Sequence, residues 1–476
     1  MKSDFRHVHF LGICGTAMGA VAAAMRAQGY IVTGSDEKVY PPMSTFLEEK
    51  GIKLTEGYRA ENIPAGADLI VVGNALSRGN PEVEAVLNRK LTYLSLPETL
   101  KLFFLRGRHN LVVTGTHGKT TTSALLAWIL QHAGLEPAYM IGGIARNLGQ
   151  GCSLHTSKFV VVEGDEYDTA FFDKRSKFLH YLPELVIVNN IEFDHADIFR
   201  DLDEIKLSFR RLLNVVPEIG MVLINGDDEN CIDVAQNCRA QLVEVGFSPN
   251  AARHIRDFAY RATGAAFTLL DTRFELPMVG DYNVRNAAMA ISAAHFYGVP
   301  LEKIQRAVAA FEGVKRRQEV RGEAAGITVI DDFGHHPTAI SQTIRGLRHQ
   351  YPGRRLWALF EPRSNTTRRA VFQETLPAAL GEADGVILAQ VARLDQLPEG
   401  DRLDPQKVVE TIRAQGKPAF YEPGVNEIIA RLQPALRKGD VVVIFSNGGF
   451  DDIHKRLLAK LGEGSGANTP AHAARS

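Results

Sequence analysis

The chain has 476 residues with 54 basic and 55 acidic side chains, which gives a formal net charge of -1. Such a balance provides no overall field for nucleic acid or an anionic membrane, so we expect neither as a partner and predict that any anion is captured locally. The length is sufficient for about three domains with separate cores.

The cysteines and the N-terminus indicate a cytoplasmic protein. The four cysteines form no CxxC pair and no zinc-finger spacing, which favours reduced thiols over disulfides or a structural metal. The opening residues, MKSDFRHVHFLG, carry charges where a signal peptide requires a long apolar segment, and the apolar runs elsewhere have the length of strands.

Short apolar runs alternate with helical periodicity in the first part of the chain. VHFLGI, YIVTGSD and DLIVVGN have the composition of buried strands, and Gly29 stands where an intervening helix should end. The apolar face of that helix comprises Met18, Val21, Ala22 and Met25. The strand–helix–strand order predicts a parallel sheet.

The loop after the first strand has nearly the glycine spacing of a dinucleotide-binding turn. Gly12 and Gly15 lie between the strand and the helix, and Asp36 follows the second strand. Cys14 and Ala17 stand where the GxGxxG pattern has its second and third glycines. The backbone N–H groups of this loop suit either a nicotinamide cofactor or the diphosphate of a sugar nucleotide, and the loop alone leaves both open. These groups belong to Gly15, Thr16, Ala17 and Met18.

A second series of strands begins at LVVTG and leads into the loop VTGTHGKTTT. A strand ending at Val113, a glycine turn and a helix from about Lys119 form a phosphate-binding geometry. Only two residues separate Gly115 from Gly118, so the loop is shorter than GxxxxGK[ST]. Lys119 is predicted to contact the β- and γ-phosphates of ATP, and Thr120 to bind Mg²⁺.

Two acidic clusters end the next strands of this series. FVVVEGDEYD and NNIEFDHADIF each place carboxylates after an apolar run. The carboxyl ends of parallel strands lie together, so we expect both clusters beside the phosphate loop, where oxygen ligands suit Mg²⁺. Glu163 is the preferred magnesium ligand, and His195 is expected to bind a second ion or stabilise a phosphoryl oxygen.

A third series of apolar runs, ITVIDDFG, RLWALFEP, GVILAQV and DVVVIFSNGG, predicts another sheet. The predicted fold is therefore α/β, with a Rossmann-like N-terminal domain (1–108), a central phosphate-loop ATPase domain with a mainly parallel sheet (109–320) and a Rossmann-like C-terminal domain (321–461). Small polar residues from Gly462 predict a disordered tail over 462–476.

GTHGKTTT, EGDEYD, NNIEFDHAD, GDYNVRNAAMA, KRRQE and DDFGHHPT, in this order and spacing, resemble the ATP-dependent Mur ligase family of cell-wall peptide synthetases. The resemblance covers nearly the whole chain. It implies three domains that bind a UDP-sugar, ATP and an amine component, which are joined through an acyl phosphate. The compressed phosphate loop is this family's own form.

The resemblance also implies roles for individual residues. Lys119, Glu163 and His195 match the phosphate-loop lysine, the magnesium carboxylate and the histidine of the DH pair, and Arg317 matches an arginine between the second and third domains. Asp332 matches an aspartate that holds nucleotide from the C-terminal side. The loop residues implied in ATP binding are Gly115, Thr116, His117, Gly118, Lys119, Thr120 and Thr121.

Asn283 and Asn286 match asparagines of an adenine-contacting helix. Their spacing places both on one helix face, although without the resemblance they read as helix caps. One departure concerns a second magnesium ion. Several relatives use a carbamylated lysine about fourteen residues after the histidine, but Phe209 stands there, and Lys206 one turn earlier is expected at the surface.

Longer blocks distinguish members within the family. SDEKVYPPMS, GNALSRGNPEVEAVL, EYDTAFFDKRSKF, FEPRSNT and SNGGF resemble members that attach L-alanyl-γ-D-glutamyl-meso-diaminopimelate to UDP-N-acetylmuramate in murein recycling, rather than members that add L-alanine. Arg363 and Arg368 either contact an anionic substrate or belong to a solvated basic loop. The implied sugar-nucleotide contacts are Gly12, Gly15, Thr16, Ala17, Met18, Asp36, Asn74 and Ser77.

The implied chemistry brings a substrate carboxylate against the γ-phosphate of ATP, so cations must offset the repulsion. Lys119, Mg²⁺ and Arg317 are the candidates. His335 or His336, at the start of a predicted helix, is a candidate base for the attacking amine, and one of them is equally suited to cap that helix. The phosphate loop alone also fits a switch or transport ATPase. The oligomeric state is open between monomer and dimer.

Overall fold

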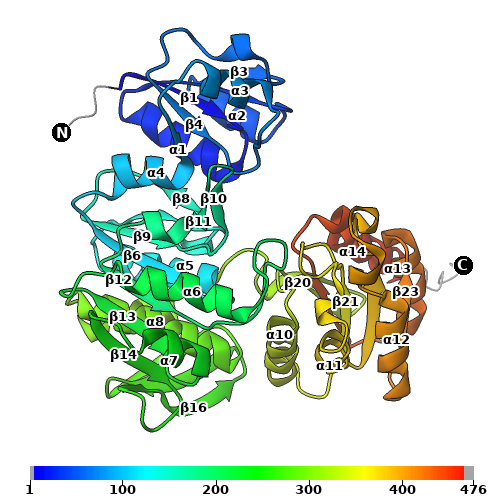
Figure 1. Ribbon diagram of the computed structural model, residues 1–476. Helices are drawn as coiled ribbons and strands as arrows, with labels where there is room; N and C mark the ends of the chain where they lie inside the picture. Colours follow the sequence, from blue (N-terminus) through cyan, green and yellow to red (C-terminus); the bar gives the residue numbers. More distant parts are fainter. Residues whose placement is uncertain (1–4, 466–476) are drawn as a thin grey trace, which may run out of the picture.

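The computed structural model describes residues 5–465, which fold into three α/β domains in chain order (Figure 1). The N-terminal domain contains a five-stranded parallel sheet in the order β3-β2-β1-β4-β5, as the sequence predicts. The strands are β1 (His7–Leu11), β2 (Ile31–Asp36), β3 (Lys53–Glu56), β4 (Leu69–Val72) and β5 (Tyr93–Ser95). The helices are α1 (Thr16–Ala27), α2 (Met43–Glu49), α3 (Pro81–Asn88) and α4 (Leu96–Leu100).

The helices of this domain begin in two different ways. Asn80 accepts two backbone N–H groups of α3 and Pro81 occupies its first turn, while Ser95 and Glu98 form a capping box on α4. Helix α1 follows Gly15 without a side-chain cap. The first N–H groups of α1 therefore stay available to a ligand above the sheet.

The central domain is built on an eight-stranded sheet in the order β15-β14-β13-β12-β6-β9-β7-β8, in which β8 alone runs antiparallel to its neighbour. Its strands are β6 (His109–Thr114), β7 (Ala138–Met140), β8 (Cys152–Ser153), β9 (Phe159–Glu163), β12 (Leu185–Val188), β13 (Met221–Asn225), β14 (Gln241–Gly246) and β15 (Arg253–His254). Its helices are α5 (Lys119–His132), α6 (Leu202–Leu213), α7 (Glu229–Ala235), α8 (Asp281–Phe296) and α9 (Leu301–Ala309).

Two small antiparallel sheets extend the central domain, and neither was predicted. One pairs β10 (Asp168–Ala170) with β11 (Asp173–Ser176). The other contains β16 (Arg256–Arg261), β17 (Gly264–Leu269) and β18 (Thr272–Leu276). These antiparallel strands do not alternate with helices, so the strand–helix pattern that predicts a parallel sheet gives no signal for them.

The C-terminal domain has a six-stranded sheet in the order β19-β20-β24-β21-β22-β23, parallel except for the β19–β20 pair. Its strands are β19 (Glu319–Ala324), β20 (Ile327–Asp332), β21 (Leu356–Phe360), β22 (Gly385–Ala389), β23 (Ala419–Glu422) and β24 (Val441–Phe445). Its helices are α10 (Pro337–Gln350), α11 (Leu376–Leu380), α12 (Pro405–Ala414), α13 (Val425–Leu432) and α14 (Ile453–Ser465).

The chain end differs in part from the prediction. Helix α14 continues to Ser465, past Gly462, where we expected disorder to begin. The rest of the predicted tail, 466–476, lies outside the described residues. Within residues 5–465, no helix is both long enough and apolar enough to cross a membrane.

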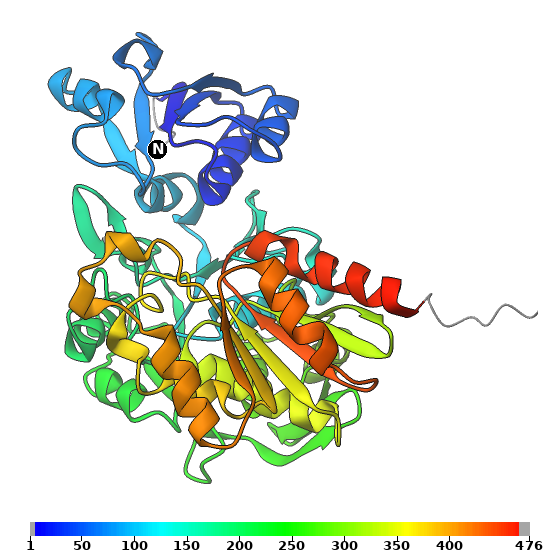
Figure 2. The ribbon, with the colours of Figure 1, turned by 90° about the vertical axis from the view of Figure 1, so that its right-hand side faces the viewer.

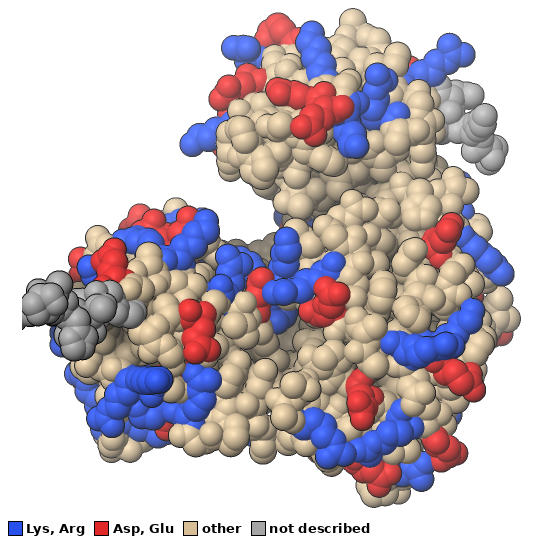
Figure 3. Space-filling model, turned by 180° about the vertical axis from the view of Figure 1, so that it is seen from behind, with Lys and Arg blue, Asp and Glu red and all other residues tan. Residues whose placement is uncertain are grey.

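The N-terminal domain packs directly on the central domain. One hydrophobic cluster runs from Phe10 and Met25 through Phe104 to Val112 and Phe209. The C-terminal domain lies beside the central domain, with α10 against α8 and β16, and Figure 2 shows it in front of the central sheet with the N-terminal domain above. Figure 3 shows the hollow that separates the N- and C-terminal domains, with Lys and Arg side chains near its floor.

The linker before β19 is unusual in its backbone conformation. Gly313, Arg316 and Gln318 have φ values of +80°, +62° and +49°. Non-glycine residues adopt this region at a cost of about 1–2 kcal/mol each. The Arg316 guanidinium donates to the carbonyls of Ser446 and Gly448 at 2.7 and 2.6 Å. Contacts made by the C-terminal domain therefore hold the linker in this conformation.

Candidate active site

The phosphate loop between β6 and α5 depends on two glycines. Gly115 and Gly118 have φ values of +122° and +79°, which suit glycine. A Cβ on Gly115 would lie 3.0 Å from the backbone of Asn190. The N–H groups of Thr116 and His117 donate to the carbonyl and side-chain oxygens of Asn190 at 3.0 and 2.7 Å. The short turn is thus braced by the segment after β12.

Lys119, the first residue of α5, forms a buried ion pair. Its Nζ donates to the Gly115 carbonyl at 2.7 Å and to Glu166 at 2.8 Å, and the lysine and glutamate side chains are 13% and 2% exposed. Burial alone lowers the pKa of Lys119, but Glu166 and neighbouring carboxylates raise it overall. A permanent cation therefore lies at the N-terminus of a helix, an arrangement suited to phosphate.

Thr120 and Glu163 supply neighbouring oxygen atoms. Thr120 Oγ1 donates to Glu163 Oε1 at 2.9 Å, and Glu163 Oε2 accepts the N–H of Gly142 at 2.7 Å. A hydroxyl and a carboxylate oxygen are the hard ligands that Mg²⁺ prefers. Thr120 and Glu163, two of the three residues predicted as metal ligands, therefore meet, and their chemistry fits magnesium.

His195 follows β12 in a left-handed backbone conformation, with φ +56°. Its Nε2 lies 3.1 Å from Glu166 Oε1. Burial lowers the pKa of His195, but the hydrogen bond to Glu166 and the charges of Glu166 and Asp194 raise it overall to about 9. Metals bind the neutral imidazole, so ligation would require loss of this proton. Stabilising a phosphoryl oxygen would not.

The position at which the resemblance implied a carbamylated lysine is part of the hydrophobic core. Phe209 is fully buried on α6 and contacts the ring of Phe178, with 5.5 Å between centroids. Lys206 is 16% exposed and pairs with Asp233 at 3.2 Å, so it is more buried than the surface lysine we expected. Phe209 contributes packing and offers no ligand for a second ion.

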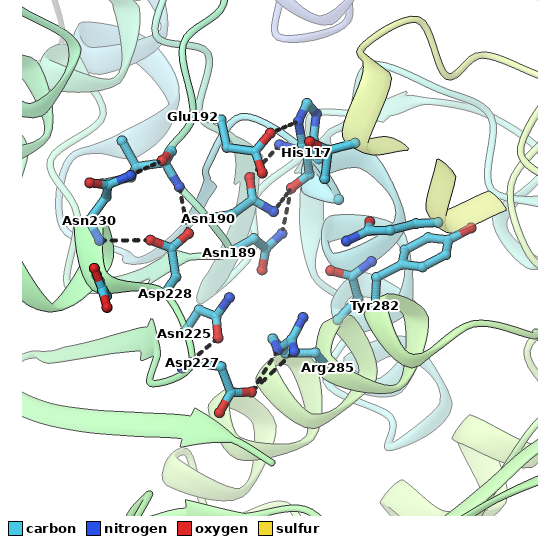
Figure 4. A pocket seen from close by; sticks show the side chains of 16 residues that line it. His117, Asn189, Asn190, Glu192, Asn225, Asp227, Asp228, Asn230, Tyr282 and Arg285 are labelled. Carbon is cyan, nitrogen blue, oxygen red and sulfur yellow. Dashed lines mark hydrogen bonds and ion pairs between the residues drawn. The ribbon is translucent and has the colours of Figure 1, made fainter. Parts of the chain in front are cut away.

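A cavity of about 400 Å³ adjoins the phosphate loop, and Figure 4 shows its polar side chains. Tyr282, Arg285 and Asn286 line it from α8. The Asn286 amide nitrogen is buried without a hydrogen-bond partner among the described residues, which leaves it available to donate to a nucleobase. Asn283 instead donates to the Val279 carbonyl at 2.7 Å. The structure thus brings only one of the two predicted asparagines to the cavity.

Asp332 and Arg317 lie at the linker. The Asp332 carboxylate accepts the N–H groups of Gln318 and Gly334 at 2.8 and 2.7 Å. Burial raises the pKa of Asp332, although the Arg317 charge opposes it. Arg317 lies 5.0 Å from the ring centroid of Phe333 and lines a second cavity of about 230 Å³. Neither residue lines the larger cavity, so their nucleotide roles stay predictions.

His335 and His336 differ in their contacts. His336 caps α10, because its Nδ1 accepts the N–H of Thr338 at 3.2 Å. His335 Nε2 lies 3.9 Å from Asp194 Oδ2. Burial lowers the pKa of both, that of His336 to about 3. Both imidazoles are therefore neutral near pH 7, and His335 is the one without a capping role.

The predicted sugar-nucleotide residues gather at one edge of the N-terminal sheet. Cys14 donates its N–H to Asp36 at 2.8 Å, and Gly73 donates its N–H to Leu11 at 3.0 Å, so the loops after β1, β2 and β4 meet. Met18 is buried. Gly12 is half-buried, and the exposed predicted residues are Gly15, Thr16, Ala17, Asn74 and Ser77. This edge belongs to a different domain from the phosphate loop.

The two predicted arginines after β21 have different environments. The Arg363 side chain is 46% exposed and lies 3.5 Å from Glu361. Arg368 is buried and donates to the Arg393 carbonyl at 3.1 Å and to Asn365 at 2.8 Å. Arg368 is therefore not part of a solvated basic loop, whereas Arg363 remains accessible.

Asn190, Asp227 and Arg285 are site residues that were not predicted. Asn190 braces the phosphate loop, and Arg285 pairs with Asp227 at 3.1 Å on the cavity wall. The polar pairs NN and DD, placed directly after or near the ends of LVIV and MVLIN, were the available signal.

The fold and this site define a nucleotide-using enzyme with a phosphate loop in the middle of three α/β domains. The chain belongs to the Mur ligase family. The matching family models are the Mur ligase family, catalytic domain (residues 7–108), the Mur ligase middle domain (113–294) and the Mur ligase, glutamate ligase domain (316–448). Membership favours a ligase over a dehydrogenase or a switch ATPase.

Individual relatives within the family show the similarity in more detail. The UDP-N-acetylmuramate–L-alanyl-gamma-D-glutamyl-meso-2,6-diaminoheptandioate ligase of Haemophilus influenzae is 42% identical over 96% of this chain and 99% of its own length. Its Escherichia coli counterpart is 43% identical over 95% and 97%. The UDP-N-acetylmuramate–L-alanine ligase of Acetivibrio thermocellus is 31% identical over 95% of each. The crystal structure of a murein peptide ligase from Psychrobacter arcticus has a TM-score of 0.71 at 36% identity, covering 96% of this chain and 99% of that one.

Proposed function

We propose that this chain joins L-alanyl-γ-D-glutamyl-meso-diaminopimelate to the lactyl carboxylate of UDP-N-acetylmuramate, with ATP and Mg²⁺, during murein recycling in the cytoplasm. The observation that carries the choice of substrate is the difference in identity. Relatives named for the tripeptide are 42–43% identical, and those named for L-alanine are 31–32% identical over a similar share of the chain.

The first step is the attack of the sugar's carboxylate on the γ-phosphate, which forms an acyl phosphate and ADP. Two unit charges at about 4 Å repel by roughly 4 kcal/mol at the effective dielectric near a protein surface. Lys119 begins α5 and is held by the Gly115 carbonyl, and its positive charge would offset this repulsion. Thr120 and Glu163 would hold Mg²⁺, which neutralises phosphate charge when bound.

Glu166 has two partners in this step. It contacts Lys119 at 2.8 Å and His195 at 3.1 Å, so it orients two cations toward the same side of the phosphate loop. An incoming phosphoryl group would compete with Glu166 for both. We infer that Lys119 and the protonated His195 then stabilise charge on the transferring group.

In the second step the tripeptide's amine attacks the acyl phosphate and expels phosphate. Only the neutral amine is nucleophilic, and its reference pKa near 8 makes deprotonation inexpensive. His335 is neutral and lies at the domain boundary, which suits a proton acceptor. Arg317 and Asp332 would reach the nucleotide through movement of the C-terminal domain, which also excludes water.

Turnover with two alternative acceptors tests the proposal. The full chain is incubated with ATP, Mg²⁺ and UDP-N-acetylmuramate, and with either the tripeptide or L-alanine, and products are identified by mass. We expect the tripeptide product, with oxygen-18 from the labelled carboxylate in the released phosphate. Preferential L-alanine addition would reassign the substrate, and unlabelled phosphate would refute the acyl-phosphate route.

A further inference from the structure

Two neighbouring residues of the C-terminal domain contact the segment that carries His195. Asn365 and Thr366 lie in the loop after β21, whereas His195 follows β12 of the central domain. The Thr366 hydroxyl accepts the N–H of Ala196 at 3.3 Å and donates to the carboxylate of Asp194. Thr366 is 1% exposed. One buried hydroxyl from another domain therefore holds the chain on both sides of His195.

The backbone of His195 depends on such support. Its φ of +56° is left-handed, which costs free energy in a residue with a side chain. The Asp194 carboxylate accepts the N–H of His195 at 2.7 Å, and the His195 carbonyl accepts the N–H groups of Ile198 and Phe199 at 2.9 and 3.0 Å. These bonds form the turn within the central domain, and Thr366 fixes the carboxylate at the start of that turn.

A second contact holds the imidazole ring. The ring of Tyr167 meets the ring of His195 edge-on, with 5.0 Å between centroids. The Tyr167 hydroxyl donates to Asp197, and the Asn365 amide donates to the same carboxylate oxygen at 2.8 Å. The Asn365 amide also lies 3.2 Å from the Tyr167 hydroxyl. The C-terminal domain therefore contacts the backbone of His195 through Thr366 and restrains its ring through Tyr167.

The position of His195 decides what its imidazole can reach. Its Nε2 lies 3.1 Å from Glu166, which contacts Lys119 at 2.8 Å beside the phosphate loop. A rotation of the His195 backbone would move the imidazole away from this pair. Displacing such a group by about 1 Å can lower a rate by about a hundredfold. The contacts from the C-terminal domain thus bear on a group whose placement sets the rate.

We propose that Thr366 and Asn365 are positioning residues, which place the imidazole of His195 for phosphoryl transfer only while the C-terminal domain is docked on the central domain. This role, which rests on the proposed ligase function, would tie transfer from ATP to the same docking that excludes water from the acyl phosphate. Neither residue is among those that line the cavity beside the phosphate loop. Both should therefore affect kcat rather than the KM for ATP.

Replacing Thr366 tests the role of its hydroxyl. Thr366→Val keeps the shape of the side chain, and kcat for ADP release should fall at least about tenfold while the KM values for ATP and UDP-N-acetylmuramate stay within about twofold. Thr366→Ser keeps the hydroxyl and should retain kcat within about threefold. Thr367→Val is the matched control, because the buried Thr367 hydroxyl lies 2.9 Å from the Ser364 hydroxyl in the same loop, and it should also keep kcat within about threefold.

A double-mutant cycle tests whether Thr366 acts through His195. His195→Gln alone should lower kcat, and adding Thr366→Val should lower it by less than about a further twofold, because the side chain to be positioned is gone. A further fall of about tenfold in that background would overturn the proposal. An unchanged kcat in Thr366→Val would overturn it too, and so would equal losses in Thr366→Val and Thr367→Val.

Tyr167→Phe tests the contact made by Asn365. The variant keeps the ring against His195 and removes the hydroxyl that Asp197 and Asn365 hold, so kcat should fall at least about threefold. The same change in the His195→Gln background should have no effect on kcat. An unchanged kcat in Tyr167→Phe alone would refute the role of Asn365.

Hydrogen–deuterium exchange without substrates tests the contact separately from the ligase function. The Ala196 N–H should exchange at least about tenfold faster in Thr366→Val than in the unmodified chain or in Thr366→Ser. Equal exchange in the three proteins would refute the contact. If the unmodified chain joins L-alanine instead of the tripeptide, kcat is measured with L-alanine. No product with either acceptor would refute the proposed function, even where the exchange result confirms the contact.

Discussion

Replacing Lys119 with alanine should have two separable effects. The variant removes a cation and leaves Glu166, which is 2% exposed, without its ammonium partner. Breaking a buried pair in this way costs about 3–5 kcal/mol. His195 still contacts Glu166 at 3.1 Å and its pKa is raised to about 9, so the lower end, about 3 kcal/mol, is expected near neutral pH. At about 2–4 °C per kcal/mol, the midpoint of the central domain should fall by about 6–12 °C.

The double variant Lys119→Ala with Glu166→Gln distinguishes stability from catalysis. The introduced glutamine would keep hydrogen-bonding capacity toward His195 but carries no charge, so most of the lost stability should return. Turnover should not return, because the phosphate loop still lacks its cation. Removing one stabilising donor typically lowers kcat by about 10²–10³-fold. Thermal unfolding and ADP release, measured on the same preparations, give the two quantities, and calorimetry checks that UDP-N-acetylmuramate still binds.

Recovery of ADP release in the double variant would refute the catalytic role of Lys119. An unchanged midpoint in Lys119→Ala would refute the energetic argument about the buried pair. Loss of UDP-N-acetylmuramate binding in Lys119→Ala would contradict the division of the two ligands between the N-terminal and central domains.

Glu163→Gln should raise the magnesium concentration required for half-maximal turnover by about tenfold or more, and an unchanged titration would reject its role as a ligand. Glu166 raises the pKa of His195 to about 9, from 6.5 in the unfolded chain. Protonated His195 therefore contributes stability that is fully present below pH 6.5 and is lost as the pH rises through about 9. Comparing unfolding at pH 6 and pH 9 in the unmodified chain and in His195→Gln checks this, since the variant should lose that part of the pH dependence. Phe209→Ala should destabilise the central domain by about 3–5 kcal/mol, measured by denaturant unfolding, because Phe209 is fully buried against Phe178. A small change in the free energy of unfolding would indicate that α6 could carry a metal-ligating side chain at position 209.

Periodicity carried most of the fold prediction. Apolar runs and the stripe through Met18 and Met25 predicted β1, α1 and β2, and Lys119 begins α5 as expected. Strand β6 extends one residue past Val113, to Thr114. Strand β16 was not predicted because RDFAYR is charged and partly exposed, and β17, although mostly buried, belongs to a hairpin that does not alternate with helices.

The site residues were predictable where they follow the ends of neighbouring parallel strands. They were less predictable where segments distant in the sequence meet. Thr120 and Glu163 could be paired because parallel strands end at one edge of a sheet. The rings of His117 and His336, with centroids 4.5 Å apart, meet because of how the C-terminal domain packs, which local sequence patterns do not specify. Likewise, the spacing of Asn283 and Asn286 placed them on one helix face, but did not indicate that Asn283 would be used by the Val279 carbonyl.

The linker with left-handed residues also contains Arg317, the residue proposed to reach nucleotide. Any swing of the C-terminal domain about residues 313–318 must therefore displace that arginine in the same motion. Arg316 adds a restraint, because its guanidinium donates to Ser446 and Gly448 on the moving body. The hinge residues and the arginine proposed to contact the nucleotide consequently lie in one stretch of chain. Opening of the domain for product release and loss of the arginine–nucleotide contact would therefore occur together.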